Sequence, residues 1–439
     1  MRVALNSFGG PAGQMSVMYK ILVEEKRWIS EERFLHALNY TMLLPGPEAQ
    51  QLATYIGWLL HSTRGGLTAG ILFILPGFFS ILILSILYAG FQDFSFVQAI
   101  FFGLKPAVMA IVVEAVFRIG RRALKNSVMI AIAASAFIAI FFFNIPFPFI
   151  VLAAGLIGYF GGKFAFEHFD VLRVTTPKKK ENEFDSEPII SNSSLVQTQP
   201  SAKRSLRVLV TSLALWFVPI LLLILALGRE HVFVEIALFF SKTAVVTFGG
   251  AYAVLAYITQ QAVDIFGWLQ PGQMLDGLGM AETTPGPLIQ VVQFVGYMAA
   301  YQFPGDLNPY LSAFYASLIT TWVTFVPCFL WIFLGAPYIE YLRGNKYLST
   351  ALAAITAAVV GVILNLALWF SLQTLFSQVE TVIIGPVRIL VPQWNTIDGA
   401  SLVIAIGAFY ALFRLKWGMI ATLSISALIG LAYYLIFLG

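Results

Sequence analysis

Charged residues are scarce in this chain. Only 11% of its 439 residues are Asp, Glu, Lys or Arg, whereas a soluble domain carries about 25%. Hydrophobic residues make up 59% of the chain, and the mean hydropathy is +0.83. This composition excludes a surface that faces water on all sides. Apolar runs such as 70–90 and 96–117 reach the roughly 20 residues that a helix needs to cross a bilayer. The sequence therefore predicts an all-α polytopic membrane protein.

Cysteine and histidine are also rare. The single cysteine, Cys328, excludes a disulfide within the chain and a cysteine-based metal site. The histidines lack the spacing of metal ligands: His36, His61, His168 and His231. No GxxxxGK[ST] phosphate-binding loop and no cleavable signal are visible. We therefore expect no metal, no cofactor and no ATP hydrolysis. Basic cytoplasmic loops explain the net charge of +4 better than nucleic-acid binding does.

Two motifs occur twice in the chain. Phe-Gly-Gly begins at Phe8 and again at Phe248, 240 residues later. Pro-Gly-Pro begins at Pro45 and again at Pro285, at the same spacing. Trp28 and Trp268 are also 240 residues apart. Three landmarks at one offset indicate a duplicated unit that carries two helix-breaking motifs in each copy.

The duplication and the composition divide the chain into four parts. The predicted parts are an N-terminal repeat (1–167), a disordered cytoplasmic linker (168–205), an extra transmembrane helix (206–231) and a C-terminal repeat (232–439). The linker is rich in charges, Ser, Pro and Gln and has no apolar period. Counting every apolar segment gives about thirteen transmembrane segments, and residues 379–394 are expected at the membrane interface.

Lysine and arginine predict the orientation of the two copies. In the first copy, basic residues lie in the loop at 118–125 and in the linker, whereas the loops at 91–95 and 144–146 have none. In the second copy the corresponding loops show the opposite pattern. We therefore expect two inverted-topology repeats with discontinuous helices, a plan known from transporters with a site at the membrane midplane. The extra helix is the crossing that inverts the second copy.

The repeated motifs should break helices inside the membrane. Glycine pairs end helices easily, and proline suits the first turn of a new helix. A new helix presents free N–H groups and the positive end of its dipole, which together bind anions. Unwound backbone at membrane depth is tolerated where protein or water covers it. Kinks for close packing are the alternative for a single break, but two kinds of break in both copies favour a binding site.

Charged residues inside apolar segments are costly and usually functional. Lys105 lies midway along an apolar segment, and its expected partner is an acid from elsewhere, such as Glu48, or the transported anion itself. Glu282 precedes the second Pro-Gly-Pro. Glu114 is expected to pair with Arg118, four residues further on.

These motifs resemble the chromate ion transporter family. The resemblance lies in Phe8–Pro11 with the downstream LPGPEAQQLATYIGW, in GLKPAV around Lys105, and in TFGGAY and ETTPGPL of the second copy. It implies a two-domain transporter of the bacterial inner (plasma) membrane that exports chromate and exchanges it with protons. One departure is that only seven residues precede Phe8, so we expect a late start or a short first arm.

The breaks, their neutral donors and the resemblance together give a set of expected substrate contacts: Phe8, Gly9, Gly10, Pro11, Pro45, Gly46, Pro47, Glu48, Gln50, Gln51, Lys105, Phe248, Gly249, Gly250, Glu282, Thr283, Thr284, Pro285, Gly286, Pro287 and Gln290. The expected partners are chromate or a similar oxyanion and the lipid bilayer, and a homodimer is left open. Sulfate or another oxyanion is the alternative substrate. A membrane enzyme acting on lipid phosphates is disfavoured because the intramembrane acids are isolated.

Overall fold

The computed structural model describes residues 1–8, 10–42, 44–164, 166–169, 201–248, 251–338 and 346–437. Most of the predicted linker, 170–200, therefore lies outside the described residues, as do Gly9, Gly249 and Gly250. The described part is almost entirely helical, with one two-stranded antiparallel hairpin.

The first half consists of α1 (Arg2–Leu5), α2 (Gly10–Tyr19), the π-helical turn η1 (Lys20–Glu25), α3 (Glu31–Thr41), α4 (Glu48–Phe91), α5 (Ser95–Ala123), α6 (Ser127–Phe141), α7 (Phe147–Phe164) and α8 (Phe166–Phe169). Helix α9 (Ala202–Leu227) follows.

The second half consists of α10 (Val232–Val246), α11 (Ala251–Gln260), the π-helical turn η3 (Gln261–Ile265), α12 (Gln273–Thr283), the 3₁₀ turn η4 (Leu288–Gln290), α13 (Val291–Gln302), α14 (Pro309–Gly335), η5 (Ala336–Tyr338), α16 (Lys346–Leu375), β1 (Val379–Ile384), β2 (Val387–Pro392), η6 (Trp394–Thr396), α17 (Gly399–Phe413) and α18 (Met419–Phe437).

The two halves repeat the same order of elements. In each, a broken helix leads into a helix that ends in a π-helical turn, and another helix then runs to a Pro-Gly-Pro break. The π-helical turn lies at nearly the same place in both copies, beginning at Lys20 and at Gln261. Among the described residues of the first half, no helix corresponds to α9.

Helix α4 is two helices folded back on each other. His61 and Ser62 leave the helical conformation, and Ser62 has a φ of +53°. A Cβ placed on Gly57 would meet the carbonyl oxygen of Gly65, which in a straight helix would lie two turns away. The first arm (48–60) therefore runs antiparallel to the second arm (63–91). This fold-back corresponds to the separate helices α13 and α14 of the second half.

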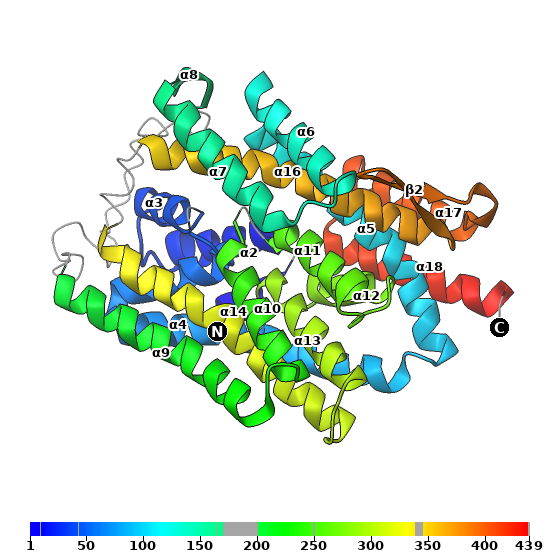
Figure 1. Ribbon diagram of the computed structural model, residues 1–439, viewed down its shortest axis with the longest axis horizontal. Helices are drawn as coiled ribbons and strands as arrows, with labels where there is room; N and C mark the ends of the chain where they lie inside the picture. The colour runs from blue at the N-terminus through cyan, green and yellow to red at the C-terminus, as the bar shows by residue number, and fades with distance from the viewer. Residues whose placement is uncertain are drawn as a thin grey trace.

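Contacts between segments far apart in sequence define two ends of the molecule. At the end where α9 begins, the Arg204 guanidinium lies over the Trp58 ring, and the hydroxyls of Ser205 and Tyr338 are 3.1 Å apart. At the other end, near the β1–β2 hairpin, the Gln273 amide donates to Gln92 at 3.1 Å. In Figure 1 the long helices α9, α14 and α16 run between these ends, with α3 toward the left and α12 toward the right.

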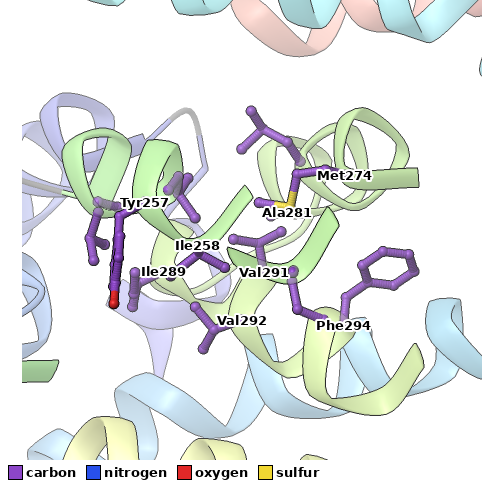
Figure 2. Packing of buried hydrophobic residues seen from close by; sticks show 14 of the residues in the cluster. Tyr257, Ile258, Met274, Ala281, Ile289, Val291, Val292 and Phe294 are labelled. Carbon is purple, nitrogen blue, oxygen red and sulfur yellow. The ribbon is translucent and has the colours of Figure 1, made fainter. Parts of the chain in front are cut away.

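The core lies around α16, which packs against α5, α6 and α7 of the first half, and around α13, which packs against α14 and α4. In the most apolar part of α16, 78% of the residues are buried, whereas the corresponding share in α9 is 11%. Figure 2 shows apolar side chains of α11, α12, η4 and α13 gathered at this core, including those of Tyr257, Met274 and Phe294. Large apolar side chains such as Phe149 (64% exposed) and Leu225 (74%) cover the outside. An apolar exterior of this kind fits a hydrocarbon environment.

Seven of the described helices are long and apolar enough to cross a bilayer: α4, α5, α7, α9, α14, α16 and α18. Two shorter apolar helices, α6 and α17, accompany them. The chain is thus an all-α polytopic membrane protein, as predicted. The expected count of about thirteen segments treated the half-helices beside the breaks as crossings, and their length does not support that count. Residues 379–394, expected at the interface, form the β1–β2 hairpin and the start of η6.

Candidate functional site

Each half contains two breaks in its helical backbone. The first break separates α1 from α2, and the equivalent break separates α10 from α11. Gly10 opens α2 with a φ of +70°, which glycine adopts readily. The Pro-Gly-Pro breaks have Gly46 and Gly286 at φ of +123° and +108°. The four predicted breaks are therefore present, and Gly10, Gly46 and Gly286 stand at positions with a positive φ.

The breaks of one half bind to those of the other half. The Gly46 amide donates to the Thr247 carbonyl oxygen at 2.8 Å, and the Gly286 amide donates to the Ser7 carbonyl oxygen at 3.1 Å. Ser7 and Thr247 are equivalent positions, as are Gly46 and Gly286, because both pairs are 240 residues apart. All four breaks thus meet at one junction between the halves. In this conformation the two Pro-Gly-Pro amides join the halves and are not free for an anion.

Buried amide side chains surround this junction. The Gln14 amide donates to the Gly286 carbonyl oxygen at 2.6 Å, and the Gln51 amide donates to the Pro45 carbonyl oxygen at 2.7 Å. Gln290 donates to the side-chain oxygen of Gln293, which in turn donates to the backbone of α4. The side-chain oxygens (Oε1) of Gln50, Gln51 and Gln290 have no hydrogen-bond partner among the described residues. Polar groups without partners are expensive in a buried place, so they mark a region suited to a polar ligand or water.

Threonine hydroxyls near the second Pro-Gly-Pro bind their own helix. Thr283 donates to carbonyl oxygens of α12, and Thr284 donates to Ala281. Their hydroxyl protons are therefore already used in this conformation. Of the other expected contacts, Pro45 and Pro47 are buried, Pro285 is half-buried, and Phe8 and Phe248 are half-buried beside the first breaks. Gly9, Gly249 and Gly250, and the side chain of Pro11, lie outside the described residues.

Glu282 lies at the junction with its side chain fully buried. One carboxyl oxygen, Oε1, accepts a hydrogen bond from the Tyr252 hydroxyl of α11. The other, Oε2, has no hydrogen-bond partner among the described residues. A Cβ placed on Gly10 would lie 3.9 Å from that oxygen. The acid of the second half therefore faces the start of α2 in the first half.

Lys105 pairs with Asp276. Its ammonium lies 3.5 Å from Asp276 Oδ1, and the Tyr88 hydroxyl donates to Asp276 Oδ2 at 2.8 Å. The prediction that the partner comes from elsewhere in the fold is confirmed, but the example given, Glu48, is replaced by Asp276. Glu48 instead begins α4. Lys105 is 32% exposed and Asp276 only 5%, so the acid depends on the lysine more than the reverse.

The sequence reasoning missed Asp276, Tyr252 and Tyr88. The only signal for Asp276 was an aspartate at the edge of an apolar segment, and nothing local linked it to Lys105. The expected pair of Glu114 with Arg118 is present, with the two side chains 2.6 Å apart.

A second polar cluster lies at the end with the β1–β2 hairpin. Arg388 reaches Asp264 at 3.8 Å beside a hollow lined by Gln260, Asn365 and Trp369. Burial raises the pKa of Asp264 above its ordinary value, and the nearby guanidinium opposes the shift. This pair ties the tip of η3 to the β1–β2 hairpin.

The fold defines a helical polytopic membrane protein whose two similar halves meet at four broken helices. Comparison with known families gives a match to the chromate transporter family over residues 1–159 and 234–431. The chain belongs to the chromate transporter family. The two matched regions correspond to the two halves and leave out the linker and the whole of α9.

Three relatives illustrate the similarity. The probable chromate transport protein of Synechococcus elongatus is 27% identical over 90% of this chain and 88% of its own. The chromate transport protein of Cupriavidus metallidurans is 26% identical over 83% and 79%. The chromate transport protein of Pseudomonas aeruginosa is 31% identical over 83% and 77%. No solved structure is significantly similar to the chain.

Proposed function

We propose that this protein is a secondary transporter that exports chromate across the plasma (inner) membrane of a bacterium. Membership of the chromate transporter family supports the substrate, and the relatives are named as transport proteins rather than enzymes. The junction of the four breaks is the observation that supports a transport mechanism. Gly46 and Gly286 bind reciprocally across it, so unwound backbone from both halves is brought to one buried place.

The chemistry of the junction suits a tetrahedral dianion. Helices α2 and α11 begin there, and each contributes N–H groups without partners inside its own helix. The nearby side chains are mostly neutral amides such as Gln14, Gln50 and Gln290. Neutral donors and helix ends can hold an anion without a permanent ion pair, which allows the anion to leave again. The expected contacts at Pro45–Gln51 and Glu282–Gln290 therefore stay in the proposal as the walls of the site.

The topology proposed here has inverted repeats with re-entrant breaks. The tip between α11 and α12 contacts the end near the β1–β2 hairpin through Gln273 and Gln92. The turn of α4 at His61–Ser62 follows Trp58, which contacts Arg204 at the opposite end. Each pair of half-helices would then enter and leave the membrane on the same side. The side used by the first copy would be opposite to the side used by the second. Nine helices would cross: the second arm of α4, α5, α6, α7, α9, α14, α16, α17 and α18.

The membrane potential favours export. Moving one charge through 100 mV is worth ~2.3 kcal/mol, so a dianion gains roughly twice that on leaving a negative interior. In the proposed topology the basic loops and the linker are cytoplasmic, in line with the positive-inside pattern. Export therefore requires no ATP.

Chromate accumulation in cells tests the function. Cells expressing the protein are expected to hold less chromate than cells carrying the empty vector, and an excess of sulfate should compete only if sulfate shares the site. A higher chromate content in expressing cells would contradict export. A change in the sulfate content of the cells with no change in their chromate content would favour a sulfate transporter. A homodimer, which the sequence leaves open, would appear as twice the chain mass when the protein is sized in lipid nanodiscs.

A further inference from the structure

Glu282 places a carboxyl group in the buried junction. Its side chain has no exposed surface, and its only described hydrogen bond comes from the Tyr252 hydroxyl to Oε1. Oε2 is buried and without a partner. A buried carboxylate is costly unless a charge or several donors compensate it. Its surroundings therefore must supply a donor, or the group must carry a proton.

The start of α2 faces the free oxygen. A Cβ on Gly10 would lie 3.9 Å from Glu282 Oε2 and 3.7 Å from the Tyr252 hydroxyl. Gly10 opens a helix of ten residues, so its first N–H groups have no partners within the helix and carry the positive end of its dipole. A carboxylate at this place can accept hydrogen bonds from the free N–H groups and lies at the positive end of the helix dipole, as a bound anion would.

Other charged groups do not neutralise Glu282 directly. Arg118 and Glu114 of α5 are the charged groups that act on it, and they are paired with each other at 2.6 Å. Asp276, one and a half turns earlier on α12, is paired with Lys105. The ion pairs found among the described residues do not include Glu282. The α2 N-terminus is therefore the main compensation for a charge on this carboxyl.

The acid is present in one copy of the repeat. The offset of 240 residues relates Glu282 to Met42 and Tyr252 to Ala12. The backbone junction is the same in both halves, but the acid–tyrosine pair is not. One transporter chain thus contains one such carboxyl.

We propose that Glu282 occupies the α2 N-terminus as a carboxylate when the site is empty and takes up one proton when an oxyanion dianion replaces it there. The proton comes from water and resides on Oε2, which changes from an acceptor into a donor toward the bound anion. No bond other than this O–H bond forms or breaks. This inference rests on the proposed function, because it assigns the proton-linked group of that same site.

The linkage can be measured on the full-length protein in lipid nanodiscs. Chromate is titrated by calorimetry in buffers of different ionisation enthalpy, between about pH 8 and about pH 9, where nearly all of the chromate is the dianion. For the wild type we expect uptake of up to one proton per anion and an affinity that weakens by up to about tenfold per pH unit. Difference infrared spectra should show a new protonated-carboxyl band when chromate is added.

Two variants locate the proton. Glu282→Gln is a neutral isostere and should bind chromate without proton uptake, without the carboxyl band and with an affinity that is independent of pH. Glu235→Gln, which neutralises an acid in the first turn of α10, should keep the proton uptake of the wild type. Proton uptake that persists in Glu282→Gln, or disappears in Glu235→Gln, would overturn the assignment.

The wild-type measurement tests the role of Glu282 and the proposed transport function separately. Chromate binding without proton uptake refutes the role of Glu282 and leaves the proposed transport function standing. Absence of chromate binding by a folded wild-type protein refutes the proposed function itself. If Glu282→Gln does not fold, the proton count and the infrared band of the wild type still decide the question.

Discussion

Substitution of Gly286 and of its equivalent, Gly46, should affect the protein unequally although the two positions are related by the repeat. A Cβ on Gly286 would lie 2.9 Å from the Cα and 3.0 Å from the amide nitrogen of Gly77, in the backbone of α4. A Cβ on Gly46 would lie 2.8 Å from Gln51 Nε2 and 2.9 Å from Cys328 Sγ. The first neighbour is a helix backbone, whereas the second neighbours are the ends of side chains that can rotate.

The expected magnitudes follow from two separate costs. Both glycines have a φ near +110° to +120°, and alanine held in such a conformation costs about 1–3 kcal/mol. Gly286→Ala adds overpacking against a rigid backbone, which costs about 1–3 kcal/mol more. We therefore expect Gly286→Ala to lose about 2–6 kcal/mol of stability and Gly46→Ala to lose about 1–3 kcal/mol.

Unfolding of the purified protein, followed by tryptophan fluorescence, ranks the variants. Two open glycines serve as controls because a Cβ on either would meet nothing within 4 Å: Gly385, with a φ of +60°, and Gly399, without a positive φ. Gly385→Ala measures backbone strain alone, and Gly399→Ala measures neither cost. The reasoning is refuted if Gly286→Ala is no less stable than Gly46→Ala, or if both behave like Gly399→Ala.

Three further predictions concern the ion pair, the junction and the topology. Lys105→Gln leaves the buried Asp276 without its cation and should lower the free energy of unfolding by about 3–5 kcal/mol. Adding Asp276→Asn should restore stability. Chromate affinity should stay low in this double variant only if the lysine contacts the anion. Gln14→Ala removes the amide that donates to the Gly286 carbonyl oxygen and should lower stability by about 1–3 kcal/mol, so an unchanged unfolding midpoint would contradict a structural role. Single cysteines placed in the linker and after Phe437 should react with impermeant reagents from opposite sides of the membrane, against a low background because Cys328 is buried, and labelling from the same side would exclude the inverted arrangement.

The breaks could be predicted because glycine and proline act locally. Gly46 and Gly286 adopt backbone angles that other residues avoid, so a repeated Pro-Gly-Pro indicates a repeated turn whatever surrounds it. The composition likewise determines the class of protein, because a chain with so few charges cannot present a polar exterior. The first prediction depends on one residue type and the second on the average composition of the chain. Neither requires knowledge of tertiary contacts.

The partners of the charged residues could not be predicted in this way. Lys105 meets Asp276 from a helix 171 positions away in the sequence, and Tyr252 meets Glu282 across a turn and another helix. Such pairs depend on how helices cross, which hydropathy and spacing do not encode. The number of crossings stays a prediction for a related reason. An apolar half-helix has the same hydropathy whether it continues through the bilayer or turns back.

The junction combines a symmetric backbone with asymmetric side chains. The hydrogen bonds of Gly46 and Gly286 are equivalent. In the proposed inverted topology, exchanging the conformations of the two halves would regenerate the same backbone contacts on the other side of the membrane. Glu282 has methionine at its equivalent position, and Gln14 has valine at position 254. The two conformations would therefore be alike in backbone energy but would differ in how the carboxyl and the amide meet the anion. A difference confined to a few side chains is what a transporter needs to link anion movement to a proton while keeping both orientations accessible.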